Sequence, residues 1–224
     1  MKSNIKILSI LAIIFFANIT AKAQFSTGNT FVQGSLNINH PLKQDLIPQK
    51  RYGIGVDWGK YTSPNVANIY SMNVSLDLIK VTNSPYENNI LNISFAKGKE
   101  YYKSIFGKFG VYGRIMGGVS YTKNYTSTPQ SNGIIRFTEN VGNSVNLNLY
   151  GSGGFMYHVN DRFSVTANLL NANIASLGYS WGNTHQYYTI GNGDSVEGNF
   201  NQFNYNFRPN VSLSYGLGIR YIFK

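Results

Sequence analysis

The chain has 224 residues, with 19 lysines and arginines, 9 acidic residues, 23 glycines and no cysteine. Charged residues make up only 12% of the sequence, about half of the roughly 25% found in ordinary globular domains, whereas aromatic residues reach 15%. The lack of cysteine excludes a disulfide scaffold and a thiolate metal site. The aromatic content excludes the apolar-poor composition of a disordered chain.

The first 23 residues have the pattern of a secretory signal peptide. Lys2 and Lys6 precede the charge-free run Ile7–Ala21, and Ala21–Ala23 supplies a small-x-small cleavage site. The run is shorter than the ~20 apolar residues of a membrane-spanning helix. We therefore predict cleavage after Ala23, with residues 24–224 as one mature domain of net charge +7 instead of +10. Export argues against nucleic acid as a partner of this basic chain.

The mature chain alternates between apolar and polar residues over long stretches. Period-two alternation predicts β-strands, and no amphipathic helix pattern competes with it. We expect eight strands: Phe31–Asn39, Tyr52–Lys60, Tyr70–Lys80, Ile90–Tyr102, Phe109–Lys123, Ser144–Val159, Arg162–Trp181 and Asn210–Lys224.

Alternation alone does not say which face of a barrel points outward. Several segments reach the ~9–11 residues that cross a bilayer, and their polar faces carry mainly glycine, serine and asparagine. Aromatic residues near strand ends suit the two membrane–water interfaces; they are Trp58, Tyr121, Tyr215, Tyr221 and Phe223. We therefore predict an all-β fold, an eight-stranded antiparallel up-and-down transmembrane β-barrel with both termini in the periplasm and no cofactor.

The connections between the predicted strands differ in length. Asn160-Asp161 reads as a two-residue turn, whereas Asn124–Asn143 and Gly182–Phe207 are long. Alternating short and long connections fit periplasmic turns and outer loops. Ten strands remain an alternative, if the longest connection contains a hairpin.

Three stretches carry a family resemblance: Phe106–Tyr121, His158–Val165 and the ending Leu217–Lys224. On these, the chain resembles the small outer-membrane β-barrels of Gram-negative bacteria, of the OmpA/OmpX type. The resemblance implies an outer-membrane location, contacts with outer-membrane lipids and lipopolysaccharide, and assembly by the barrel-assembly machinery. Members typically end in an aromatic residue, whereas here Phe223 is followed by Lys224.

Four charged residues fall on the polar faces of the predicted strands and are expected in the lumen: Arg114, Arg220, Asp57 and Asp77. A buried charge without a partner is costly, so these side chains are expected to pair. The interior of an eight-stranded barrel is just filled by its own side chains, which favours a structural plug over an ion path.

Candidates for catalysis and metal binding are sparse. His40, His158 and His185 are dispersed, and no serine or carboxylate is placed with them in a recognisable triad. Asn192–Glu197 lacks the spacing of a calcium loop. We predict no catalytic residue, no metal site and no enzyme activity.

The two long connections are the candidates for an interaction surface. They are rich in Asn, Tyr, Ser and Gly, the composition of adaptable recognition surfaces, and Tyr187, Tyr188, Phe203 and Tyr205 are the residues expected to contact a ligand. For Phe200–Phe207, however, the alternation of Phe203, Tyr205 and Phe207 with Asn204 and Asn206 favours an extension of the last strand above the membrane plane. We expect a structural or interaction role, with adhesion or ligand capture by the loops; the alternatives are a narrow solute channel and a lipid-modifying enzyme.

One stretch does not fit the alternation simply. Strict alternation after Phe95 would point Lys97 and Lys99 into lipid. Either these lysines reach the periplasmic headgroups, or a bulge at Gly98 shifts the register.

Overall fold

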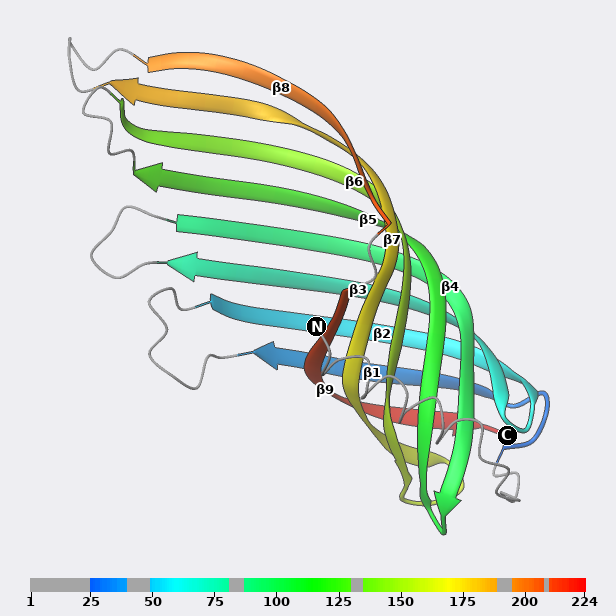
Figure 1. The fold of residues 1–224 in the computed structure, drawn as a ribbon. Coiled ribbons are helices and arrows are strands. Elements are labelled where there is room, and N and C mark those ends of the chain that lie inside the picture. The colour runs from blue at the N-terminus through cyan, green and yellow to red at the C-terminus, as the bar shows by residue number, and fades with distance from the viewer. Residues whose placement is uncertain (1–24, 40–48, 81–86, 130–134, 189–194, 208–209) are drawn as a thin grey trace, which may run out of the picture.

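The computed structural model describes residues 25–39, 49–80, 87–129, 135–188, 195–207 and 210–224, so the predicted signal peptide lies outside it. In this part of the chain no helix is long and apolar enough to cross a membrane. Its regular elements are β1 (Thr30–Asn39), β2 (Gln49–Ser63), β3 (Val66–Lys80), β4 (Glu87–Phe106), β5 (Phe109–Pro129), β6 (Ile135–His158), β7 (Phe163–Tyr188), β8 (Ser195–Asn206) and β9 (Asn210–Phe223) (Figure 1).

The strands close into a ring of eight positions. Each strand from β1 to β7 pairs antiparallel with the next, and β9 closes the ring by pairing with both β1 and β7. β8 and β9 together occupy one strand position next to β7, because β9 pairs with the first half of β7 and β8 pairs with the second half. The predicted eight-stranded antiparallel up-and-down barrel is confirmed, and the segment Ser195–Asn206 extends the eighth position instead of forming a new hairpin.

The ring closes with a stagger between its strands. Following the paired residues once around the barrel from Phe163 on β7 leads back to the same strand at Ala175. A closed sheet with such a stagger requires strands tilted against the barrel axis, and Figure 1 shows this tilt. Tilting brings side chains from non-adjacent strands together in the lumen.

The strands are longer than predicted at their outer ends. β5, β6 and β7 have 21, 24 and 26 residues, well beyond the ~9–11 that span a bilayer. The prediction that 124–143 and 182–207 are loops was therefore wrong for most of both stretches, because paired strands occupy 124–129, 135–143, 182–188 and 195–206. Figure 1 shows the outer ends as a sheet with β8 along its edge.

The two faces of the barrel differ in polarity as predicted. Large apolar side chains are exposed on the outward face of every barrel strand, among them Leu36, Val56, Met72, Ile115, Leu147 and Leu217. Charged and polar side chains are instead buried inside. This distribution is the reverse of a water-soluble barrel and is typical of a transmembrane barrel, whose outward face contacts lipid.

The register around Gly98 follows strict alternation. The β3–β4 pairing has no bulge, and Gly98 lies opposite Ile69 and Met116 on the two neighbouring strands. Lys97 and Lys99 are therefore exposed on the outward face, and Glu100 is buried inside. A Cβ at residue 98 would clash with the carbonyl of Ile115, so this glycine allows β4 and β5 to pack closely instead of forming a bulge.

Candidate functional site

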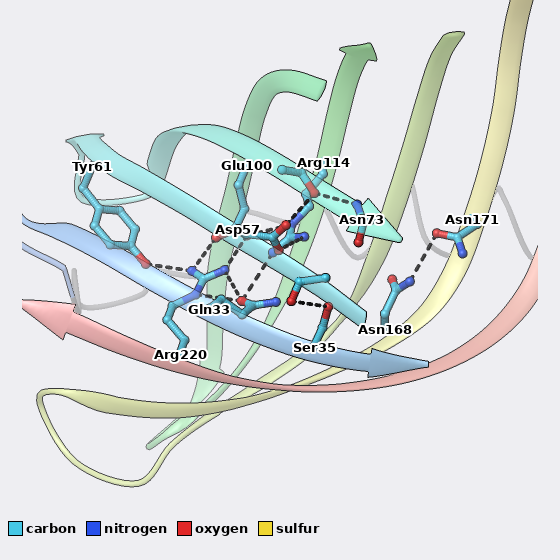
Figure 2. A network of polar contacts seen from close by, with 12 residues as sticks. Gln33, Ser35, Asp57, Tyr61, Asn73, Glu100, Arg114, Asn168, Asn171 and Arg220 are labelled. Atoms are coloured by element: carbon cyan, nitrogen blue, oxygen red, sulfur yellow. Dashed lines mark hydrogen bonds and ion pairs between the residues drawn. The ribbon is translucent and has the colours of Figure 1, made fainter. Parts of the chain in front are cut away.

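A network of charged and polar side chains fills the lumen between β1, β2, β4, β5 and β9, with Arg220 at its centre (Figure 2). Arg220 is completely buried. Its Nη1 and Nη2 donate to the two Glu100 carboxylate oxygens at 2.6 and 2.7 Å. The remaining contacts join its guanidinium to Gln33 Oε1 at 3.0 and 2.8 Å and to the Tyr61 hydroxyl at 2.9 Å. The guanidinium also lies 4.0 Å from the Phe31 ring centre, a cation–π distance.

Arg114 extends the network towards β2. Its Nε donates to Glu100 Oε2 at 2.9 Å, and its Nη1 donates to Asp57 Oδ2 at 2.8 Å. Asp57 in turn accepts a hydrogen bond of 2.6 Å from the Ser71 hydroxyl. Two arginines thus face two carboxylates, and Glu100 contacts both guanidinium groups. The pairing neutralises the charges inside the barrel, as a buried ion network requires.

The structure places only three of the four predicted lumen charges in this network. Arg114, Arg220 and Asp57 belong to it. Asp77 is also buried, but it forms a separate bidentate pair with Arg51, whose Nε and Nη2 each lie 2.6 Å from a carboxylate oxygen. The two residues are direct cross-strand partners on β2 and β3, so the register holds Asp77 away from Arg220.

Glu100, Gln33, Tyr61 and Arg51 were not singled out by the sequence analysis. The signal for Glu100 was present, because strict alternation past Phe95 places every even-numbered residue of β4 inside. Gln33 stands on the polar face of the first predicted strand. Nothing in the alternation distinguished it from its neighbours, however, since its role depends on Arg220, 187 residues away in the chain.

An aromatic layer lies against the network at the end of the barrel where the described chain begins, at Phe25, and where β9 ends. Phe25 is buried and stacks on Tyr61, with ring centres 4.2 Å apart, and contacts Tyr102 and His158 edge-on at 5.0 Å. The chain enters this position through a turn at Gly28, whose φ of 95° suits glycine, and Gly28 N–H donates to the Tyr61 carbonyl at 2.8 Å. The segment before β1 therefore packs into the barrel end.

Two of the three histidines lie in the described part of the chain. His158 contacts the Ser164 hydroxyl at 2.8 Å and the Tyr102 hydroxyl at 3.0 Å, but Ser164 is completely buried and has no surface for a substrate. His185 lies 3.8 Å from Glu197 on the outer sheet. Within the described residues no group of three or more acidic, histidine or cysteine residues could hold a metal ion. His40 falls outside those residues.

A polar cavity of about 630 Å³ lies in the lumen on the outer side of the network. Asp57 and Arg114 line it, together with serine and asparagine side chains such as Ser35, Asn73, Ser152, Asn168 and Asn171. Asn168 donates to Asn171 Oδ1 at 3.2 Å (Figure 2), and its own Oδ1 is buried without a partner among the described residues. Small polar side chains thus leave space in the outer half of the lumen, whereas large ones fill the other half.

The predicted interaction residues lie on the outer sheet extension, by which we mean the paired strand ends 124–129, 135–143, 182–188 and 195–206. Phe203 and Tyr205 on β8 point outward and are 61% and 71% exposed. The Tyr187 hydroxyl donates to Glu139 Oε2 at 3.2 Å, which raises the pKa of that phenol. Tyr188 ends β7, and its side chain is outside the described part. Phe200 lies on the opposite face of β8, next to Gly142 and Gly182, which explains why it is out of phase with Phe203 and Tyr205.

The predicted interfacial aromatics all lie on the outward face, with different surroundings. Tyr221 packs between Phe163 and Phe223 at the end of β9, with ring centres 4.9 and 4.8 Å away. Trp58 stacks on Tyr70 at 5.8 Å. The two remaining residues are Tyr121, which donates to Asn143 at 2.6 Å, and Tyr215, which is exposed in the middle of β9.

No protein-family model matches the sequence, and no curated protein matches it either. Among solved structures, the chain is similar to the outer membrane protein OprG from Pseudomonas aeruginosa, with 15% identity, coverage of 89% of this chain and 98% of that chain, and a TM-score of 0.42. A major outer membrane protein from Thermus thermophilus matches with 11% identity, 88% and 100% coverage, and a TM-score of 0.46. Neisserial surface protein A matches with 13% identity, 88% and 98% coverage, and a TM-score of 0.36. The resemblance to OmpA/OmpX-type barrels stays a prediction.

Proposed function

We propose that the chain is an outer-membrane β-barrel that does not catalyse a reaction or transport solutes, and that acts through interactions of its outer sheet extension. The membrane location is supported by the apolar outward face and by strands long enough to cross a bilayer. A signal peptide at residues 1–23 would direct the chain to the export pathway. Outer-membrane lipids, lipopolysaccharide and the barrel-assembly machinery are the partners expected of any such barrel.

The filled lumen argues against the alternative of a solute channel. The Arg220 network and the Phe25 layer are stacked across the same end of the barrel, and both consist of side chains that are almost completely buried. A solute entering the polar cavity from the outer side would therefore meet a closed end. The catalytic alternative is disfavoured by the burial of Ser164, the only serine paired with a histidine among the described residues.

The expected result for Arg220→Ala is a less stable barrel that still conducts no current. Removing the guanidinium leaves Glu100 partly unpaired and lowers the melting temperature, whereas Phe25, Phe31 and Tyr61 continue to block the lumen. Single-channel recording of the refolded protein in planar bilayers, with melting measured in parallel, checks this. A steady current in the wild type, or a new current in a variant that melts like the wild type, would favour the channel.

The observation that carries the interaction role is the open edge of β8. Among the described strands β8 pairs with β7 alone, over Ser176–Tyr187, so its other edge faces no second strand in the described part of the chain. An edge of this kind can add an extended segment of another protein by β-augmentation, with side-chain contacts giving specificity. Phe203 and Tyr205 project next to that edge and would supply those contacts.

The double variant Phe203→Ser with Tyr205→Ser is expected to abolish adhesion without changing barrel stability. Both side chains are exposed beyond the barrel, so their loss removes contact area for a partner but no packing of the lumen. Retention of expressing cells on immobilised extracellular-matrix proteins and glycans measures the effect. Asn201→Ser, an outward polar position on the same strand, is the matched control. Retention equal to that of cells lacking the protein, before any substitution, would contradict the proposed role.

A further inference from the structure

Two rows of side chains on the outward face of β2, β3 and β4 form an unusual group, which we call the lysine patch. The strand register places Trp58, Tyr70 and Lys97 side by side in one row, which we call the upper row. Lys60, Asn68 and Lys99 form the next row, called the lower row, which is closer to the β2–β3 turn. Lys60, Asn68, Lys97 and Lys99 are all exposed. Because neighbouring strands lie ~4.8 Å apart, the Cα atoms of Lys60 and Lys99 are about 10 Å apart, with Asn68 between them.

The lysine patch lacks an acidic ion-pair partner in the described part of the chain. None of its lysines forms an ion pair among the described residues. On the outward faces of β2, β3 and β4 the only acidic residue is Glu87, at the opposite end of β4. The surrounding outward residues are apolar, such as Val56 and Met72. Exposed ammonium groups that lack an ion-pair partner can donate to an anion from outside the protein, so an external anion would stabilise this surface.

The position of the lower row identifies which anion is within reach. Lys60 lies three residues before the end of β2 and pairs with Thr30, which also pairs with Phe223 near the C-terminus. This is the end at which the described chain begins with Phe25 and finishes with Lys224, and it faces the periplasm in an even-stranded barrel. Lysine side chains at such positions extend towards the headgroups of the nearer leaflet.

We infer that the lysine patch binds the phosphate of an anionic phospholipid in the periplasmic leaflet. The ammonium groups of Lys60 and Lys99 and the amide of Asn68 supply donors to the phosphate oxygens. The upper row offers a surface for the acyl chains, since Trp58 stacks on Tyr70 at an interplanar angle of 12° and Lys97 Nζ lies 5.3 Å from the Tyr70 ring centre. A zwitterionic lipid fits less well, because its own cation would face three lysines. The inference rests on the proposed membrane location.

Quenching of Trp58 fluorescence by brominated lipids tests the inference. The chain has only two tryptophans, so Trp181→Phe leaves Trp58 as the sole reporter, within the patch. The protein is refolded into phosphatidylcholine vesicles that contain equal mole fractions of either brominated phosphatidylglycerol or brominated phosphatidylcholine. We expect phosphatidylglycerol to be preferred at the reporter by about 25-fold, because each of Lys60 and Lys99 contributes about fivefold to the binding of anionic lipid near a membrane surface. High salt should reduce the preference.

Substitutions separate this site from general attraction by a basic protein. Lys60→Gln with Lys99→Gln should remove the preference and leave folding intact, because both side chains are exposed. Lys123→Gln, on the outward face near the other end of β5, should leave it unchanged. Equal quenching by both lipids in the unsubstituted reporter protein overturns the inference, and so does equal loss of preference in the Lys123 variant. Vesicle flotation reports membrane insertion separately. Protein that floats but is quenched by neither lipid has the patch covered by another protein copy, which overturns this inference but not the proposed membrane location. Protein that does not float contradicts the proposed membrane location.

Discussion

Replacing Glu100 with glutamine is expected to lower the free energy of unfolding of the barrel by about 3–5 kcal/mol. Glu100 is 1% exposed and contacts the guanidinium groups of both Arg220 and Arg114. The amide keeps the shape of the side chain but removes its charge. Arg114 then keeps Asp57, but the buried Arg220 loses its carboxylate partner. Breaking a buried ion pair by neutralising one partner is far more destabilising than losing a surface pair.

Denaturant unfolding of the refolded barrel, followed by tryptophan fluorescence and by the gel mobility of the folded form, measures this loss. Glu197→Gln is the matched control, because Glu197 is exposed and lies 3.8 Å from His185; it should change stability by less than about 1 kcal/mol. Glu100→Leu combined with Arg220→Met removes the pair together and leaves Arg114 with Asp57. This double variant should be more stable than either single one. Wild-type unfolding of Glu100→Gln would show that the Glu100 carboxylate does not hold the network together.

The barrel could be predicted from sequence because two solvents impose opposite demands on alternate residues. In the membrane-crossing part each strand meets lipid on one face and a narrow lumen on the other, so Leu213, Leu217 and Ile219 alternate with small or polar residues. That demand ends where the strands leave the membrane. In β7, the stretch from Asn183 to Gln186 is polar on both faces but continues to pair with β6 and β8. Polar strands of this kind read as loops, which is why most of the outer sheet extension was missed, whereas the alternating stretch Phe200–Phe207 was predicted to extend the last strand.

The faces of the lumen charges could be predicted, but their partners could not. Alternation places Asp57, Asp77 and Arg114 inside, yet which charges meet depends on the stagger of the closed ring and on side-chain length. Arg51 lies directly opposite Asp77, whereas Arg114 reaches Asp57 from a strand that is not its neighbour in the ring. The alternation within a single strand does not determine its register with the neighbouring strands, because shifting the pairing by two residues keeps every side chain on the same face.

The position of Gly98 links the register of β4 to the network, because it lies between the outward Lys97 and Lys99 and two residues before Glu100. We expect Gly98→Val to destabilise the barrel by at least about 3 kcal/mol or to prevent its assembly. An added Cβ would clash with the carbonyl of Ile115 and approach Met116 Cα at 2.7 Å. Both atoms belong to the backbone of β5, so no flexible side chain can move aside. The two strands would have to separate next to Glu100 and Arg114, which are direct partners in the register.

Gly117→Val provides the matched control on the adjacent strand. Gly117 lies opposite Lys97 on β5, one residue along from the partner of Gly98, but a Cβ added there meets nothing within 4 Å. Valine at this outward position replaces a flexible residue with a good strand former, so stability should stay equal or rise slightly. Folding yield and denaturant unfolding, compared between the two variants, separate close backbone packing from a general intolerance of valine. If both variants folded and unfolded alike, β4 would have to contain the bulge at Gly98 that strict alternation excludes, and Glu100 would no longer be placed in the lumen.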